Sequence, residues 1–110
     1  MSKNKFIEEC VLYINGYYQY NCSYYSFGNS YGKVDQNVEL KEETEVNALG
    51  HKIVIDKVNE NSVDITVDDK KSVTLNINDK ICIEYYNRTS GSNENFTVDV
   101  MELFVSLVKK

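Results

Sequence analysis

The sequence predicts an all-β fold: a single-domain antiparallel β-sandwich or small barrel of about seven or eight strands, with room for one short terminal helix. Three observations support this prediction. The length of 110 residues suits one domain. The 13 Val and 8 Ile far outnumber 1 Ala and 2 Met, and β-branched residues favour strands. Apolar and polar residues also alternate from Val38 to Val100, which is typical of strands with one solvated face.

The tyrosine-rich N-terminal part, residues 6–32, is predicted to form a hairpin. Residues 6–14 fit both a helical face and a strand. We favour a strand because Asn15-Gly16 follows, and this dipeptide prefers the two-residue type I′ turn. The two arms are then expected at about 8–14 and 17–25, with a loop over 26–32.

The remainder, residues 33–108, is rich in Val and Ile and is predicted to be a meander on which the hairpin packs. Its strands lie between turns rich in Asn and Asp, such as residues 59–61 and 69–71. Apolar residues occupy even positions up to Val100 and odd positions from Met101 onward, so the apolar side of the predicted strand changes there. This change indicates a long C-terminal strand with a β-bulge in preference to a short helix.

The net charge of −5 excludes one class of partner. An acidic domain repels phosphates, so we expect no binding to a nucleic acid backbone. No run of residues is apolar enough to cross a membrane, and no secretory leader follows Met1. The expected location is therefore cytoplasmic. Abundant Lys, Asn and Ile with little Ala and no Pro suits an AT-rich bacterial or phage genome.

The three cysteines, Cys10, Cys22 and Cys82, show no metal-binding spacing. We expect reduced and mostly buried thiols, with a Cys10–Cys22 bridge across the hairpin as an option in an oxidising compartment. Neither a metal nor another cofactor is expected.

The sequence does not contain the residue patterns of the common types of catalytic site. His51 is the sole histidine, with no serine or cysteine nucleophile nearby in sequence, and it is expected to be an ordinary surface residue. The carboxylates lie at turns or at the polar positions of strands, as on a solvated face. Gly28–Gly32 lacks the Lys-Ser/Thr ending of a phosphate-binding loop. We therefore expect a protein that is not an enzyme.

The most distinctive feature of the composition is its tyrosine content, with 9 Tyr against 4 Phe and no Trp. Its ring has an apolar face and a polar tip, and tyrosine is enriched at recognition surfaces. Parity assigns Tyr18, Tyr20 and Tyr24 to the core. The candidate binding residues are Tyr17, Tyr25, Tyr31, Tyr86 and Arg88.

The function predicted from these features is a non-catalytic protein-binding or inhibitor module that presents a tyrosine-rich surface. One alternative is a β domain that binds a small molecule or glycan in a pocket lined by Tyr and Asn. Another is a structural subunit of a bacterial or phage assembly that associates through edge strands.

Overall fold

The computed structural model describes residues 2–22, 28–91 and 96–110, which form one helix and eight strands. The first sheet has the order β2-β1-β8-β7 and consists of β1 (Cys10–Cys22), β2 (Gly28–Glu39), β7 (Lys80–Gly91) and β8 (Phe96–Lys109). The second sheet has the order β3-β4-β5-β6 and consists of β3 (Glu45–Ala48), β4 (His51–Val58), β5 (Ser62–Val67) and β6 (Lys71–Asn76). All pairings are antiparallel.

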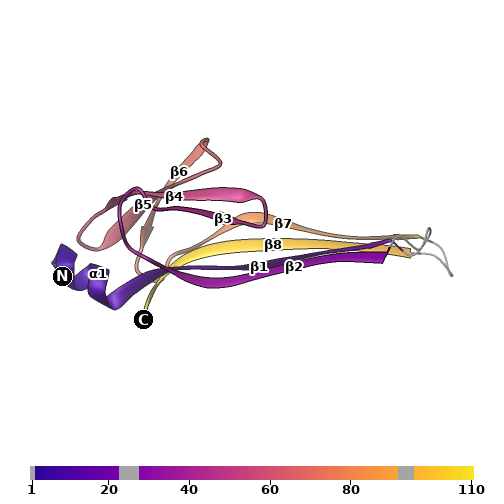
Figure 1. The fold of residues 1–110 in the computed structure, drawn as a ribbon, viewed down its shortest axis with the longest axis horizontal. Helices are drawn as coiled ribbons and strands as arrows, with labels where there is room; N and C mark the ends of the chain where they lie inside the picture. The colour runs from indigo at the N-terminus through magenta and orange to yellow at the C-terminus, as the bar shows by residue number, and fades with distance from the viewer. Residues whose placement is uncertain (1, 23–27, 92–95) are drawn as a thin grey trace.

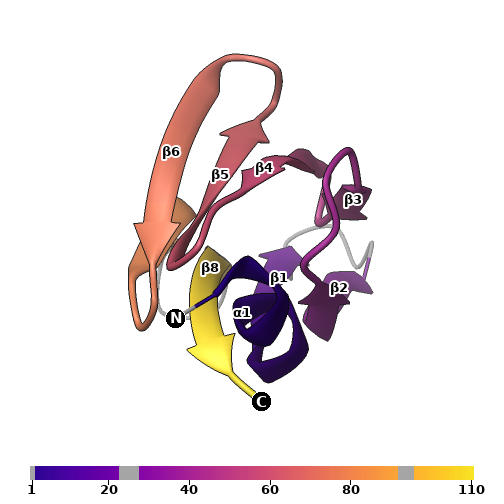
Figure 2. The same cartoon turned by 90° about the vertical axis from the view of Figure 1, so that its left-hand side faces the viewer.

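The prediction of an all-β fold is confirmed: two four-stranded sheets face each other across one apolar core, and neither closes into a barrel in the described part of the chain (Figures 1 and 2). The alternating residues of the central strands supply this core, as the periodicity predicts. Fully buried members include Leu12, Ile14, Ile55, Ile65 and Leu103.

Residues 6–14 divide between a helix and a strand. Helix α1 (Lys3–Glu9) begins after Ser2, whose side chain accepts a hydrogen bond from the Lys5 backbone N–H (3.3 Å). A serine at this N-cap position satisfies a backbone donor that the first turn leaves free. The chain becomes extended at Cys10, where β1 begins. The N-terminal part of the expected strand is thus helical, with Phe6 buried beneath it.

The predicted turn at Asn15-Gly16 is wrong, because β1 runs straight through it and pairs on both sides. Gly16 serves a different purpose there. A Cβ atom at Gly16 would lie 2.1 Å from the Glu102 carbonyl oxygen of β8, so only glycine permits this close approach of two strands. The expected loop over 26–32 is also wrong from Gly28 onward, where β2 begins.

The β-bulge predicted in the C-terminal strand near Val100 is wrong, because the described bulge of this sheet lies in the neighbouring strand β7. The long C-terminal strand is confirmed as β8, and its pairing with β1 is unbroken. The β-bulge lies in β7, between Cys82 and Glu84. It turns Glu84 toward the core-facing side of the sheet, opposite the buried Leu103.

The cysteines differ from the expectation in two respects. Cys10 is buried and free, whereas Cys82 is exposed and free. Cys10 and Cys22 are the two ends of β1, and a strand of 13 residues at about 3.3 Å per residue separates them by about 40 Å. A bridge between them is therefore excluded in this fold.

The two sheets differ greatly in length, and this difference positions the candidate site. The strands of the first sheet have 12 to 14 residues, whereas those of the second have 4 to 8. The first sheet extends well beyond the second in a molecule of 59 × 25 × 17 Å (Figure 1). No described strand therefore lies above the inner face of its distal half.

Candidate functional site

The inner face of the long sheet changes character where the short sheet ends. Along β1 the inward positions Leu12 and Ile14 are fully buried, but Tyr18 and Tyr20, which follow Gly16 on the same face, are not, and Tyr20 is 38% exposed. We call the side chains on this uncovered part the tyrosine face. Its members are Tyr18 and Tyr20 of β1, Tyr86 and Arg88 of β7, and Asp99 and Met101 of β8.

Three rings form a row across this face. The centroids of Tyr18 and Tyr20 lie 5.3 Å apart with their planes tilted by 32°, and those of Tyr20 and Tyr86 lie 6.4 Å apart at 23°. The Tyr20 hydroxyl donates to the Met101 sulfur at 3.9 Å. A hydrogen bond with Tyr20, partial burial and nearby acidic groups raise the pKa of Tyr86 from its ordinary 10 to about 12.

Gly32 of β2 makes room for the first ring of the row. A Cβ atom at Gly32 would lie 2.2 Å from Cε1 of Tyr18, its cross-strand neighbour. The Tyr18 ring thus lies over the bare backbone of β2, a close approach that any other residue at position 32 would prevent.

A groove of about 670 Å³ lies where the tyrosine face meets the end of the short sheet. Tyr18, Tyr20 and Met101 line it from the long sheet, and Leu49-Gly50 lines it from the β3–β4 turn. Lys33 of β2 also lines it, and Glu84 adds a carboxylate. The groove therefore combines aromatic and aliphatic walls with a few polar groups, the composition of many ligand and peptide sites.

Backbone strain marks the turn that walls this groove. Leu49 has φ +49° and Gly50 has φ +84°, and a two-residue turn of this kind needs positive φ at both positions. Glycine adopts such a conformation freely, whereas for leucine it costs about 1 kcal/mol. Leu49 nevertheless packs against the core, so its side chain is held at the mouth of the groove against the preference of its backbone.

A polar link between the sheets lies beside the groove. His51, at the start of β4, has Nδ1 2.6 Å from Asp68 Oδ2 and Nε2 2.5 Å from Glu84 Oε2. Asp68 follows β5 in the short sheet, whereas Glu84 belongs to the long sheet. A neutral imidazole has one N–H and can donate to one carboxylate, so the charged form is the one that satisfies both. Both ring nitrogens are engaged, which leaves no free lone pair for a general base.

The pKa values of this link follow its geometry. Burial lowers the pKa of His51, but its hydrogen bonds to Asp68 and Glu84 outweigh burial and hold it above the ordinary 6.5. The backbone N–H of Lys52 donates to Asp68 at 2.9 Å, and this bond, followed by the one from His51, lowers the pKa of Asp68.

We expect the His51 link to make stability depend on pH. Because the folded-state pKa is raised, its contribution is complete below pH 6.5 and is lost as the pH rises through the folded-state value. Wild type should exceed His51→Gln by about 1 kcal/mol in the free energy of unfolding under acidic conditions, and by less near about pH 9. Urea titrations across this range measure the difference.

The control for the His51 link is Asp69→Asn, which changes the neighbouring carboxylate without touching His51. The difference in unfolding free energy between Asp69→Asn and wild type should stay the same from acidic conditions to about pH 9. Parallel curves for wild type and His51→Gln would instead show that the imidazole carries no charge-dependent stability.

The remaining predicted site residues lie on different surfaces. Tyr86 and Arg88 belong to the tyrosine face, where Arg88 Nη2 contacts Asp99 Oδ2 at 2.7 Å. Tyr17 and Tyr31 lie on the outer face of the long sheet, which the short sheet does not face: Tyr17 is opposite Lys33 and Tyr31 is opposite Gln19. The structure therefore does not bring these two pairs together. Tyr25 lies outside the described residues.

Tyr18 and Tyr20 are site residues that parity had assigned to the core. The prediction that they point to the same side of the sheet as the core residues is confirmed. The prediction that they are buried in the core is wrong, because the short sheet does not reach them. A signal was present: the positions of this parity change from Leu12 and Ile14 to Gly16 and then to tyrosine.

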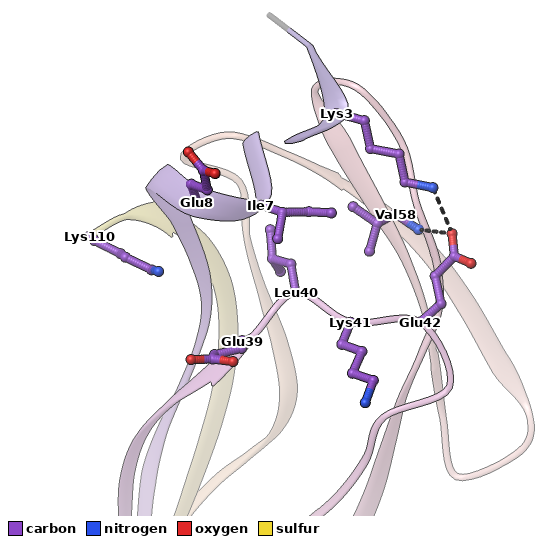
Figure 3. A pocket seen from close by; sticks show the side chains of 9 residues that line it. All are labelled: Lys3, Ile7, Glu8, Glu39, Leu40, Lys41, Glu42, Val58 and Lys110. Carbon is purple, nitrogen blue, oxygen red and sulfur yellow. Dashed lines mark hydrogen bonds and ion pairs between the residues drawn. The ribbon is translucent and has the colours of Figure 1, made fainter. Parts of the chain in front are cut away.

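A second hollow of about 660 Å³ lies beside helix α1 (Figure 3). Ile7, Leu40 and Val58 are its apolar residues, and lysines and glutamates in equal number surround them. Two of these are engaged with each other: Lys3 Nζ lies 3.2 Å from Glu42 Oε1, and Glu42 also accepts the Val58 backbone N–H at 3.1 Å. Its balanced charges favour no particular sign of ligand.

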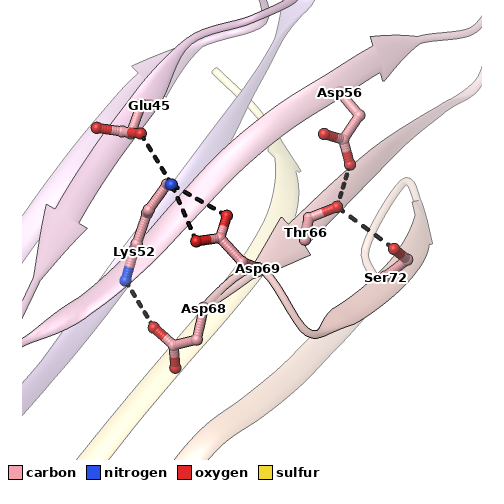
Figure 4. A network of polar contacts seen from close by, with 7 residues as sticks. All are labelled: Glu45, Lys52, Asp56, Thr66, Asp68, Asp69 and Ser72. Atoms are coloured by element: carbon pink, nitrogen blue, oxygen red, sulfur yellow. Dashed lines mark hydrogen bonds and ion pairs between the residues drawn. The ribbon is translucent and has the colours of Figure 1, made fainter.

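The outer face of the short sheet carries a network of polar contacts (Figure 4). Lys52 Nζ contacts Asp69 Oδ1 at 3.0 Å and Glu45 Oε1 at 3.4 Å. Thr66 donates to Asp56 and also contacts the Ser72 hydroxyl at 3.3 Å. The acidic groups of this face are thus paired with neighbouring donors, as expected of a solvated surface.

Neither a metal site nor a membrane span is found among the described residues. Over those ranges, no group of three His, Cys, Asp or Glu side chains is arranged to hold a metal ion, and no helix is long and apolar enough to span a membrane. Comparison with protein-family models, with curated proteins and with solved structures finds no match.

Proposed function

We propose that this protein is a non-catalytic protein-binding module whose tyrosine face receives apolar or aromatic side chains of a partner protein. The observation that carries the proposal is the row of Tyr18, Tyr20 and Tyr86 on a part of the sheet that no other described strand covers. Tyrosine offers a large contact area at low cost in conformational entropy, which is why it is frequent in binding surfaces.

The groove beside this row supplies the place for an anchor. Binding energy at interfaces concentrates in a few side chains that fill well-packed pockets. Here Leu49 and Met101 provide aliphatic walls and Tyr18 provides a ring, so an inserted aromatic or aliphatic side chain would be surrounded on several sides. The strained conformation of Leu49 is consistent with a residue retained for contact in preference to turn stability.

Charges near the face are neutralised by their neighbours, which favours an interface centred on apolar contacts. Arg88 is paired with Asp99, and Glu84 is paired with His51. Depletion of free charge with enrichment of aromatic residues is the composition of interface centres.

Selection of peptides from a phage-displayed random library tests this proposal. Tyr20→Ala should weaken binding of the selected peptides by about 30-fold, the effect of losing a central interface tyrosine worth about 2 kcal/mol. The matched control is Tyr85→Ala, which removes an exposed tyrosine from the outer face of the same sheet. Equal affinity of both variants, measured by biolayer interferometry, would contradict the proposal.

A glycan ligand is the second candidate, and one observation favours it. Rings in a row on a sheet, with the Glu84 carboxylate at the groove, also suit stacking against a sugar with a polar contact at its edge. The same two variants on a glycan array separate the candidates. Glycan binding that is lost in Tyr20→Ala, together with failure to select any peptide, would replace the protein partner by a glycan.

A further inference from the structure

The long sheet has two edge strands, and they differ in how they are protected. β7 carries the bulge between Cys82 and Glu84, which breaks the regularity of its edge. β2 has no such feature. Its register with β1 is unbroken from Val11↔Glu39 to Cys22↔Gly28, and the chain contains no proline. Among the described pairings β2 bonds to β1 alone, so a long row of backbone donors and acceptors faces outward.

Proteins usually block such an edge with bulges, prolines, inward-pointing charges or a covering segment. The charges of β2 point to the outer face instead, because Lys33 lies opposite Tyr17 and Asp35 lies opposite Asn15. Both side chains are exposed. They leave the backbone of the edge accessible to another strand.

The sequence of β2 is complementary to itself in an antiparallel arrangement. With a two-fold axis at Val34, Lys33 of one strand lies opposite Asp35 of the other, twice over, and Val34 lies opposite Val34. Tyr31 then lies opposite Asn37. A shift of the axis to Lys33 or to Asp35 would place like charges opposite each other, which is destabilising. The axis at Val34 also lets pairing extend from Asn29 to Glu39, almost the whole strand.

An axis at Gln36 is the other register with matched charges, since it places Lys33 opposite Glu39. It uses less of the strand, because pairing within β2 then begins only at Lys33. The number of backbone hydrogen bonds therefore favours the axis at Val34.

We propose that a second copy of this chain pairs with β2 about a two-fold axis at Val34, joining the two long sheets into one continuous antiparallel sheet. Directly opposite residues of an antiparallel pair point to the same side. The two tyrosine faces therefore lie on one side of the joined sheet. An interface of this kind is isologous, so it closes at two copies.

Charge reversal tests the interface and its register by sedimentation velocity over a range of concentrations. Wild type should dimerise, and Lys33→Glu should weaken the dimer at least tenfold, since the introduced carboxylate would face Asp35 of the second copy. The double variant Lys33→Glu, Asp35→Lys should restore it, because the exchanged charges match again. The matched control is Lys71→Glu, which changes the net charge equally at an exposed position of β6 and should leave the dimer intact.

Zero-length carbodiimide crosslinking identifies the contact directly. In a mixture of ¹⁴N- and ¹⁵N-labelled wild type, mass spectrometry should find mixed-label peptides that join Lys33 to Asp35. A monomeric wild type at every concentration would overturn the proposal, as would a Lys33→Glu variant that dimerises like wild type. Mixed-label peptides joining Lys33 to Glu39 would overturn the register. Tyr20→Ala should remain dimeric, so failure of peptide binding and failure of dimerisation are separate results.

Discussion

Gly16→Ala is expected to destabilise the protein by about 3 kcal/mol, because the added methyl group has no space between two central strands. Its Cβ would lie 2.1 Å from the Glu102 carbonyl oxygen and 2.9 Å from the Leu103 Cα. Both are backbone atoms of β8, which is fixed by pairing with β1 and β7. Neither can move without disrupting the sheet. Urea unfolding followed by circular dichroism measures the loss.

The control for Gly16→Ala is Gly50→Ala, because Gly50 is required for its backbone conformation and not for lack of space. Gly50 has φ +84° and nothing within 4 Å of an added Cβ, so Gly50→Ala meets a conformational cost of about 1 kcal/mol and no clash. A Gly16→Ala variant as stable as Gly50→Ala would show that β1 and β8 do not approach as closely as described.

Phe6→Ala is expected to cost about 4 kcal/mol, the second large effect. Phe6 is fully buried in the core although it belongs to a helix of 7 residues. A helix this short is not stable alone, so its packing holds it in place. Removing the ring leaves a cavity and detaches α1 from the sandwich. Amide hydrogen exchange over residues 3–9, together with urea unfolding, measures both consequences.

Glu8→Ala provides the comparison for Phe6, since Glu8 lies exposed on the same helix. It should change the unfolding free energy by less than about 0.5 kcal/mol. If Phe6→Ala and Glu8→Ala were equally mild, α1 would not contribute to the core.

The interior of the sandwich follows closely from the sequence. Val63, Ile65 and Val67 alternate with polar residues, and all three are buried in β5. Such a pattern has one physical solution, since a strand places alternate side chains on opposite faces and the apolar face is the one that leaves water. Local periodicity therefore determined which residues form the short sheet and its core.

Turn preference was a weaker guide, because a dipeptide acts on few residues and pairing over a whole strand overrides it. Asn15-Gly16 favours a turn by itself, yet Gly16 pairs with Val34 on one side and Leu103 on the other. Those partners lie far away in the chain. The bulge of β7 likewise could not be predicted from the local sequence. It places Tyr86 on the inner face and Tyr85 on the outer face, the reverse of what simple alternation from Ile81 gives.

By itself, the sequence determined the fold class, the alternating core and the concentration of tyrosine in the N-terminal third. Only the tertiary structure decided where those tyrosines lie. Tyr18 and Tyr20 have the parity of core residues, and whether such residues are buried depends on the length of the opposing sheet. That length is a property of strands β3 to β6, which lie elsewhere in the chain. Burial is a relation between two surfaces, and the pattern of one strand describes only one of them.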